Sequence, residues 1–532
     1  MSRECKVIYN FDPSHVSSIP SDGCYDEPIT KEYVESFVKE VAGRSVDTFA
    51  LCPNMLRRKL WDSKYDPHWS KEAPFIKKPD NQLNIGHDNL QYFRMRDYML
   101  SGGQPVREIY EAVRKTDMNF FFTYRMNDCH YLENPKSLIP DTFWRDHPEY
   151  RIKEYGGVHP NMHPSLCNIL QNYMYPEVRQ HYLNILTELT EGYDIDGLEL
   201  DFMRKPCLMP ITQLEEGRGV ITAFVRSVRE MLDRVGAQRN KQIQLAVRVP
   251  HSVQACWDVG MDIAAWDNEG LVDIITASTS FLHNMFALNL NSFRQVIRHA
   301  KLFAEMHFSF AYGKAWPYSG VKFIRNTTKE QYETAAYYLS HAGADGVTLF
   351  NFVGTRHHRW LDPRSTPHFG AEPPLKAMDH LNDPEYLETC PKHYFINRFI
   401  VDGREYADCA LPAVDDFKFT LHLYERNLQG TYTHAVMRVD TEDLSCHLPL
   451  VAYINGQRLE EFVGTGELFT PVSIEGLPPL ENMRYFRVPM DLLRSGDNMI
   501  EVHNAYEKYP RDFCKYTGVE LALYTHERNE RI

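Results

Sequence analysis

Glu199 and Asp201 stand two positions apart in a short and otherwise apolar run from Leu198 to Phe202. Side chains alternate between the two faces of a β-strand, so the run predicts a buried strand with both carboxylates on one side. Burying a carboxylate is costly unless it is paired, so two acids in such a strand need a reason. Catalysis is one reason, and a structural ion pair with Arg204 or Arg248 is the other.

Hydrolysis of a glycosidic bond needs one carboxyl group to protonate the leaving oxygen and another to act as nucleophile or base on the opposite side. Glu199 and Asp201 share a strand and cannot straddle a sugar, so another acid must face them. Glu305 is the candidate. We expect Asp201 and Glu305 to form the catalytic pair, with Glu199 deeper and tuning the pKa of Asp201 by like-charge repulsion. The alternative for Glu305 is an ion pair with Arg248.

Eight short apolar runs separated by helical patterns occupy residues 6 to about 355, as expected of parallel βα units. The runs lie at 6–12, 47–52, 119–124, 198–202, 243–250, 272–278, 302–307 and 346–352. Helices are expected at 31–43, 105–116, 176–191 and 219–235. This order predicts an α/β protein built on a (β/α)8 TIM barrel. An open doubly wound sheet is less favoured, because no glycine-rich phosphate loop follows the first run.

In such a barrel the active site lies at the carboxyl ends of the strands, where polar residues gather in this sequence. We expect these residues to contact the substrate: Asn10, Asp12, Arg125, Asn127, Asp128, Arg204, Arg248, His251, His307, Tyr312, Trp316 and Asn351. For each of the three asparagines, capping of the following loop is the alternative. Arginine suits planar anionic groups, so several of them at one mouth indicate an anionic sugar. Trp316 is expected either to stack on a sugar ring or to pack a loop.

Beyond Trp360 a proline-rich link at 362–367 leads into a section with strand alternation and few helical patterns. Strands are expected at 417–423, 433–439, 450–454, 485–488 and 499–502. Asn455-Gly456 is a strong tight-turn signal. We therefore expect a barrel domain over residues 1–383 and an all-β sandwich domain over residues 384–532.

The composition of the chain restricts the classes of partner that it can bind. The chain has 532 residues and a net charge of −14, which argues against a nucleic-acid-binding surface. Aromatic residues make up 13% and suit sugar rings as well as cores. The 11 cysteines include no C-x-x-C pair and no zinc-ligand spacing, so we expect reduced thiols, no metal ion and no cofactor. The sequence leaves a homo-oligomer open.

The first residues form no apolar signal core, and no apolar run approaches the roughly 20 residues of a membrane span. We therefore expect no membrane partner and a cytoplasmic location. A secreted or periplasmic protein whose signal peptide has been removed has the same sequence pattern.

Three segments carry a resemblance to a known group: 196–204 (DGLELDFMR), 266–274 (WDNEGLVDI) and 143–149 (FWRDHPE). They resemble the broad group of glycoside-hydrolase-like TIM-barrel proteins, over roughly residues 5 to 355. The resemblance implies a barrel that acts on carbohydrate, often with a β-sandwich behind it. The first segment is also similar to chitinase-type barrels, in which a Glu follows two residues after the last Asp. Met203 occupies that position here, so the chitinase acid is not carried over.

The leading hypothesis is therefore a glycoside hydrolase. A non-catalytic carbohydrate-binding barrel is the second, and Met203 favours it. A metal-dependent hydrolase or a polysaccharide lyase is the third. The histidines at 159, 163, 357 and 358 are where a metal would be sought.

Overall fold

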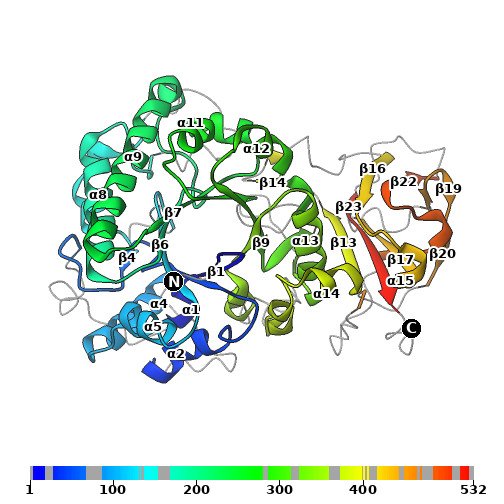
Figure 1. The fold of residues 1–532 in the computed structure, drawn as a ribbon, viewed down its shortest axis with the longest axis horizontal. Helices are drawn as coiled ribbons and strands as arrows, with labels where there is room; N and C mark the ends of the chain where they lie inside the picture. Colours follow the sequence, from blue (N-terminus) through cyan, green and yellow to red (C-terminus); the bar gives the residue numbers. More distant parts are fainter. Residues whose placement is uncertain are drawn as a thin grey trace.

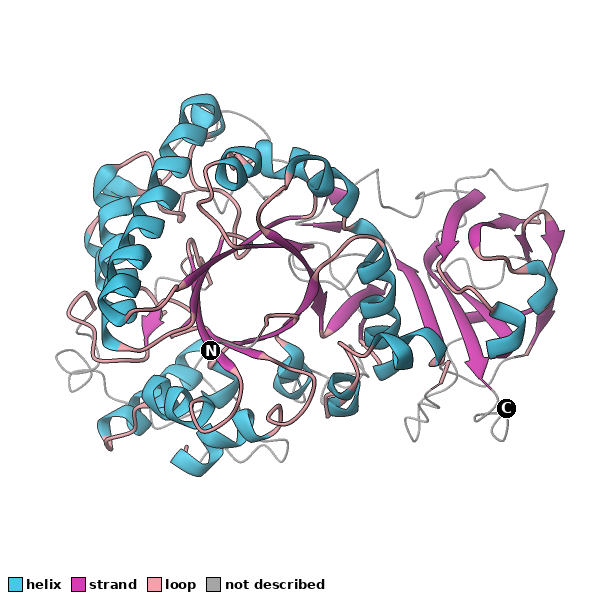
Figure 2. Cartoon of the chain, viewed as in Figure 1, coloured by secondary structure: helices cyan, strands magenta, loops and turns pink. Residues whose placement is uncertain are grey.

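The computed structural model describes residues 4–17, 28–66, 87–130, 132, 137–153, 168–279, 285–312, 323–358, 372–397, 400–401, 404–405, 416–441, 449–463, 468–469, 483–505 and 516–525. Eight parallel strands close into a barrel in the order β1-β12-β9-β8-β7-β6-β5-β2, which confirms the predicted (β/α)8 class. Figure 2 shows this ring with helices around it. The strands are β1 (Val7–Phe11), β2 (Thr48–Leu51), β5 (Asn119–Arg125), β6 (Gly197–Asp201), β7 (Gln244–Pro250), β8 (Ile274–Ser278), β9 (Lys301–His307) and β12 (Gly346–Phe350).

Four helices of the outer ring lie close to the predicted positions: α2 (Lys31–Lys39), α5 (Pro105–Val113), α8 (Pro176–Gly192) and α9 (Leu214–Arg239). The ring also includes α4 (His87–Leu100), α11 (Ile263–Asn268), α12 (Leu290–Val296) and α13 (Lys329–His341). Helix α9 is longer than its apolar pattern indicated and ends where Asn240 adopts a left-handed conformation. Helix α13 begins with a capping box between Thr328 and Gln331.

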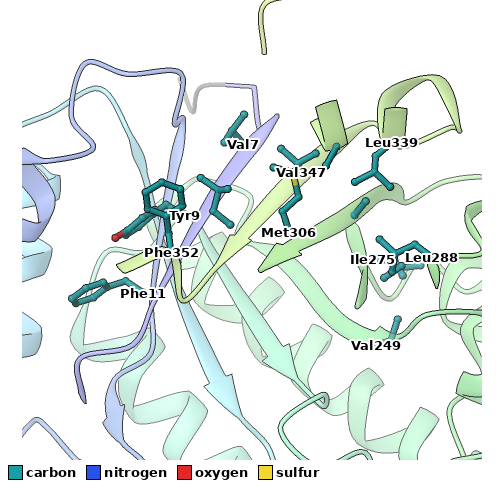
Figure 3. Close-up of a cluster of buried hydrophobic side chains, with 14 of the residues drawn as sticks. Val7, Tyr9, Phe11, Val249, Ile275, Leu288, Met306, Leu339, Val347 and Phe352 are labelled. Carbon is teal, nitrogen blue, oxygen red and sulfur yellow. The ribbon is translucent and has the colours of Figure 1, made fainter. Parts of the chain in front are cut away.

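Alternation along each strand separates two cores. On β1, Tyr9 and Phe11 point outward, and the Phe11 ring lies 4.9 Å from the ring of Phe37 on α2. Figure 3 shows this outward-facing cluster, with Tyr9, Phe11 and Phe352 side by side. The intervening residues, Ile8 and Asn10, point into the barrel. Hydrophobic packing therefore holds the helices, while the interior is free to carry polar groups.

The floor of the barrel interior is apolar and is formed by Ile8, Phe121, Ala246 and Phe303. Two glycines make room for its rings. A Cβ on Gly197 would lie 2.4 Å from the Phe121 ring, and one on Gly346 would lie 2.4 Å from the Lys6 carbonyl oxygen. These close approaches explain why β6 and β12 both begin with glycine.

Four aspartates join neighbouring strands at the amino-terminal end of the barrel. Each immediately precedes a strand and accepts a hydrogen bond from the backbone N–H at the start of the neighbouring strand. The pairs are Asp47 with Val7 (2.7 Å), Asp196 with Phe120 (2.9 Å), Asp273 with Leu245 (2.7 Å) and Asp345 with Leu302 (2.8 Å). We call this set the rim aspartates. They tie β2, β6, β8 and β12 to β1, β5, β7 and β9, and so fix strand register away from the mouth.

Two antiparallel sheets form the C-terminal domain (Figure 1). One contains β13 (Lys392–Asn397), β23 (Tyr516–Thr525), β17 (Tyr432–Thr441), β21 (Met483–Val488) and β20 (Glu460–Phe462). The other contains β16 (Asp416–Leu423), β22 (Gly496–Asn504), β18 (Leu450–Ile454) and β19 (Gln457–Arg458). Residues of both sheets share one hydrophobic core, as expected of the predicted sandwich.

The turn between β18 and β19 is the predicted Asn455-Gly456 turn, and both residues have positive φ. The domain meets the barrel at α13, where the His393 N–H donates to Thr334 Oγ1 at 2.7 Å. The division between residues 383 and 384 stays a prediction. Helix α14 (Pro384–Thr389) begins at that point, and β13 follows it.

The six described cysteines, Cys5, Cys52, Cys129, Cys207, Cys256 and Cys390, are buried free thiols, in line with the expected reduced state. Across the described ranges, none of the helices combines the length and apolarity that a membrane crossing requires.

Candidate active site at the mouth of the barrel

Asp201, Arg248 and Glu305 form the inner part of the mouth. Asp201 on β6 and Arg248 on β7 are partners in the strand ladder, and Arg248 Nη1 donates to Asp201 Oδ1 at 2.8 Å. Arg248 Nε donates to Glu305 Oε2 on β9. The Met203 N–H also donates to Asp201 Oδ1 at 2.9 Å, and Ser278 Oγ donates to Glu305 Oε1 at 2.8 Å. The Arg248 guanidinium lies over the Phe350 ring, with its Cζ 3.8 Å from the ring centroid.

This arrangement differs from the expected one, in which Asp201 and Glu305 face each other across an open mouth. Strands β6 and β9 are separated by β7 and β8, and an arginine from β7 reaches both acids. Glu305 therefore makes the ion pair with Arg248 that was its alternative role. The exposed fraction of each side chain in this cluster is 2% or less, so the guanidinium neutralises charge that burial would otherwise penalise.

Glu199 lies two residues before Asp201 on the same face of β6 and is deeper in the barrel, as expected. Its Oε1 accepts hydrogen bonds from Thr123 Oγ1 at 2.6 Å and from Asn10 Nδ2 at 3.0 Å. Burial and then the charge of Asp201 raise the pKa of Glu199 to about 7, against the opposing hydrogen bond from Thr123. Burial also raises the pKa of Glu305, although Arg248 opposes the shift. Two of the three acids therefore hold protons more firmly than free carboxyl groups do.

A second charged cluster lines the mouth beside β1 and β5. Arg125 donates to Asp12 and, at 3.4 Å, to Asp128. Arg204 Nε lies 3.8 Å from Asp128 Oδ2. Burial raises the pKa of Asp12, but Arg125, His15, Arg204 and the hydrogen bond from the Ser14 N–H together outweigh burial and lower it overall. Burial together with the charge of Arg125 lowers the pKa of Arg204 to about 10.

His130 completes this cluster and was not predicted from the sequence. Its Nδ1 lies 2.6 Å from Asp128 Oδ1, and Arg204 Nη2 lies 2.8 Å from its Nε2. A guanidinium can only donate, so Nε2 accepts and Nδ1 carries the proton toward Asp128. Burial and Arg204 lower the pKa of His130, which keeps the ring neutral. Its side chain is 28% exposed, whereas those of Asp12, Arg125, Asp128 and Arg204 are at most 8% exposed.

The three asparagines at the strand ends hold backbone or interior groups. Asn127 was expected to touch the sugar, but its Nδ2 donates to the carbonyls of Gln171 and Cys207, and its Oδ1 accepts from the Gln171 N–H. Its amide is fully engaged in joining two loops. Asn10 serves Glu199 below the mouth. Asn351 adopts a positive φ of 50°, and its backbone carbonyl accepts a hydrogen bond from the Gly354 N–H in the turn after β12.

The remaining expected contacts are dispersed. His307 is buried at the end of β9, where its ring stacks on Phe350 with centroids 5.6 Å apart. His251 is half-buried just beyond β7. The backbone of Tyr312 ends β10 (Ser309–Tyr312), but its side chain is outside the described part, and Trp316 lies outside the described residues altogether.

One of the resemblance segments, 266–274, has a structural role. Asp267 accepts hydrogen bonds from the N–H groups of Arg298, His299 and Ala300, and Trp266 Nε1 donates to Thr222 Oγ1 at 3.0 Å. They fasten the outer helices rather than the mouth. Within the described ranges, no group of three His, Cys, Asp or Glu side chains is arranged to hold a metal ion.

The fold and the mouth define a (β/α)8-barrel protein with a C-terminal β domain and a buried, charged site at the carboxyl ends of its strands. No family model matches the sequence, and no curated protein matches it. Among solved structures, the chain is similar to a glycoside hydrolase family 18 N-acetylglucosaminidase from Paenibacillus barengoltzii, with 11% identity, 71% of this chain and 100% of that chain covered, and a TM-score of 0.37.

A maltogenic α-amylase, AmyB, from Thermotoga neapolitana is similar at 11% identity, with coverages of 95% and 100% and a TM-score of 0.36. Chitinase ChiA74 from Bacillus thuringiensis is similar at 8% identity, with coverages of 94% and 98% and a TM-score of 0.39. The chain thus shows distant structural similarity to glycoside-hydrolase barrels. At this distance, function has to be inferred from the mouth of the barrel itself.

Proposed function

We propose that this protein is a glycoside hydrolase that cleaves its substrate at the carboxyl-terminal mouth of the barrel. The observation that carries the proposal is the set of three carboxylates, Glu199, Asp201 and Glu305, gathered around the single guanidinium of Arg248. Acid and base roles require carboxyl groups whose environments differ, and this set provides them.

In this mechanism Glu305 is the general acid, because burial raises its pKa and favours the protonated form. Asp201 is the nucleophile or base, held in place by the Met203 N–H and Arg248. Asp201 and Glu305 are almost fully buried, so sugar binding must draw Arg248 away from one of them. Arg248 then orients the remaining carboxylate and balances its charge.

The substrate is proposed to be an oligosaccharide or polysaccharide, with an anionic sugar as the first class to test. Arg125 and Arg204 supply the cationic groups, and each already lies beside Asp12 or Asp128. A uronic or sulfate group that binds them has to compete with those aspartates. Anionic and neutral sugars therefore need to be compared directly.

A non-catalytic carbohydrate-binding barrel is the second candidate. The bridge from Arg248 to both acids favours it, because a guanidinium that permanently neutralises both carboxylates leaves neither free for proton transfer. Met203 favours it as well, because it stands where chitinase-type barrels carry an acid.

The deciding experiment is incubation with sulfated, uronic and neutral oligosaccharides in water enriched in oxygen-18, followed by mass spectrometry. Hydrolysis places one heavy oxygen on each new reducing end. A lyase yields an unsaturated product without the label, and this result would overturn the proposal. Binding by calorimetry with no product would establish the binding barrel instead.

A further inference from the structure

One layer inside the barrel, directly beneath the mouth, consists of Ala50, Glu199, Thr276 and Thr348, one from each of the alternate strands β2, β6, β8 and β12. We call it the Glu199 layer. The strand register defines it. Each member pairs on one side with a residue of the layer above, which is Asn10, Thr123, Arg248 or Glu305. On the other side each pairs with a residue of the apolar floor, which is Phe121, Ala246, Phe303 or Ile8. Barrel interiors are filled by such four-residue layers.

The Glu199 layer holds three polar atoms that meet no hydrogen-bond partner among the described residues. They are Glu199 Oε2, Thr276 Oγ1 and Thr348 Oγ1, and each side chain is at most 1% exposed. Buried polar atoms are nearly always hydrogen-bonded, so three in one layer point to a shared partner. Ala50 and the two threonines are small side chains. A buried water needs two to four polar partners, and this layer offers three.

Charge in this layer and in the layers between it and the mouth is also out of balance. Four buried carboxylates, Asp12, Glu199, Asp201 and Glu305, project into the barrel, against two guanidinium groups, Arg125 and Arg248. The set has a formal charge of −2 when all four acids are ionised, and Asp128 and Arg204 beside it add one charge of each sign. An uncompensated charge in a sealed interior is costly, so the set must take up positive charge.

We propose that the Glu199 layer is a buried proton store. In it, Glu199 carries a proton on Oε2, and this O–H donates a hydrogen bond to a water molecule held by the Thr276 and Thr348 hydroxyls. The groups that face Glu199 from the surrounding strands are Asn10 and Thr123, which bind its other oxygen, and the charged Asp201, Arg248 and Glu305. The two acids favour the proton and the arginine opposes it. The pKa of Glu199 is raised, which likewise favours the protonated carboxyl group.

The store has a use that rests on the proposed hydrolase activity. When Glu305 gives its proton to the leaving oxygen, one proton passes from Glu199 to the water and another from the water to Glu305. The proton released by the attacking water later restores Glu199, so no proton is lost over the cycle. The protonation of Glu199 itself does not depend on that activity and is tested separately.

Infrared difference spectroscopy of the intact protein tests the proton directly. We expect wild type at about pH 6 to show a carbonyl band of a protonated carboxyl group that is absent from Glu199→Gln and fades by about pH 8. Thr276→Val and Thr348→Val keep side-chain volume but remove the water's partners. Each is expected to move the midpoint of that band upward, because the ionised form loses its water.

Thr190→Val is the matched control, since Thr190 is fully buried in α8 and its hydroxyl donates to the Leu186 carbonyl. The proposal is overturned if Glu199→Gln removes no such band, or if the two layer variants titrate as Thr190→Val does. It is also overturned if, at equal ionic strength, thermal stability at about pH 6 differs between sodium, potassium and choline chloride, because a bound cation then balances the charge. A protein that lacks hydrolase activity but keeps the band refutes the enzymatic role and leaves the store intact.

Discussion

Arg248 and Asp201 are cross-strand partners joined by a 2.8 Å hydrogen bond, and both side chains are at most 1% exposed. The same guanidinium reaches Glu305. An ion pair at this depth gains from low dielectric but must offset the desolvation of every charge in it. Its integrity is therefore a matter of stability as well as chemistry.

Arg248→Met is expected to lower the free energy of unfolding by about 3–5 kcal/mol, because it leaves two buried carboxylates without their cation. Chemical denaturation at neutral pH measures the loss. Arg226→Met is the matched control, since Arg226 pairs with Glu269 at the surface with both side chains about two-fifths exposed. That control should lose less than about 1 kcal/mol. Equal losses in the two variants would show that Arg248 contributes no more to the free energy of unfolding than a surface arginine does.

Asp201→Asn and Glu305→Gln are each expected to reduce kcat/KM on the true substrate by about 10²–10⁴-fold while the circular dichroism spectrum stays unchanged, because each removes a group that transfers a proton or attacks the sugar. Glu269→Gln, at the surface, serves as the control for loss of a carboxylate. Near-wild-type turnover in either mouth variant would remove that residue from the mechanism.

Rim aspartates should behave in the opposite way. Asp273→Ala deprives the Leu245 N–H of its acceptor and is expected to cost about 1–3 kcal/mol of stability. Because Asp273 lies at the far end of the barrel from the mouth, kcat and KM of the folded variant should match those of the wild type. Thermal unfolding and steady-state kinetics on one preparation measure both. A large change in kcat with little loss of stability would contradict this division.

The C-terminal domain should be sensitive to acid through Glu520. Burial raises the pKa of Glu520, but Arg438 and the hydrogen bond with His393 outweigh burial and lower it to about 2. A carboxyl group with a lowered pKa stabilises the fold above its unfolded value near 4.5, and that contribution is lost as pH falls toward 2. The difference between the folded and unfolded pKa of Glu520 corresponds to about 3 kcal/mol in the free energy of unfolding.

Glu520→Gln should therefore be less stable than wild type at neutral pH, and the difference should shrink progressively between about pH 5 and pH 2. Denaturant titrations of both proteins across this range measure it. A difference that is independent of pH would mean that Glu520 stabilises the domain by packing alone.

Much of the architecture follows from local sequence patterns. The eight apolar runs, the alternation that turns Glu199 and Asp201 to one side, and the Asn455-Gly456 turn depend on neighbouring residues, so the chain itself reveals them. Residues 375–379, which directly follow Pro373 and Pro374, form a short 3-10 helix, η7 (Leu375–Asp379).

The site was harder to predict, because its contacts join residues far apart in sequence. Arg248 meets Glu305 across 57 positions, and the amide of Asn127 meets loop carbonyls at Gln171 and Cys207. His130 gave one weak signal, its position two residues after Asp128 at a strand end. The rim aspartates gave a clearer signal, since an aspartate directly precedes four of the eight apolar strands.

The rim aspartates also bear on how this scaffold can be altered. Because strand register is set at one end by four short-range clamps, the opposite end can exchange side chains without the strands slipping. An engineer can therefore graft new chemistry onto residues such as Asp12, Ser278 and His307 while treating Asp47, Asp196, Asp273 and Asp345 as fixed parts of the frame.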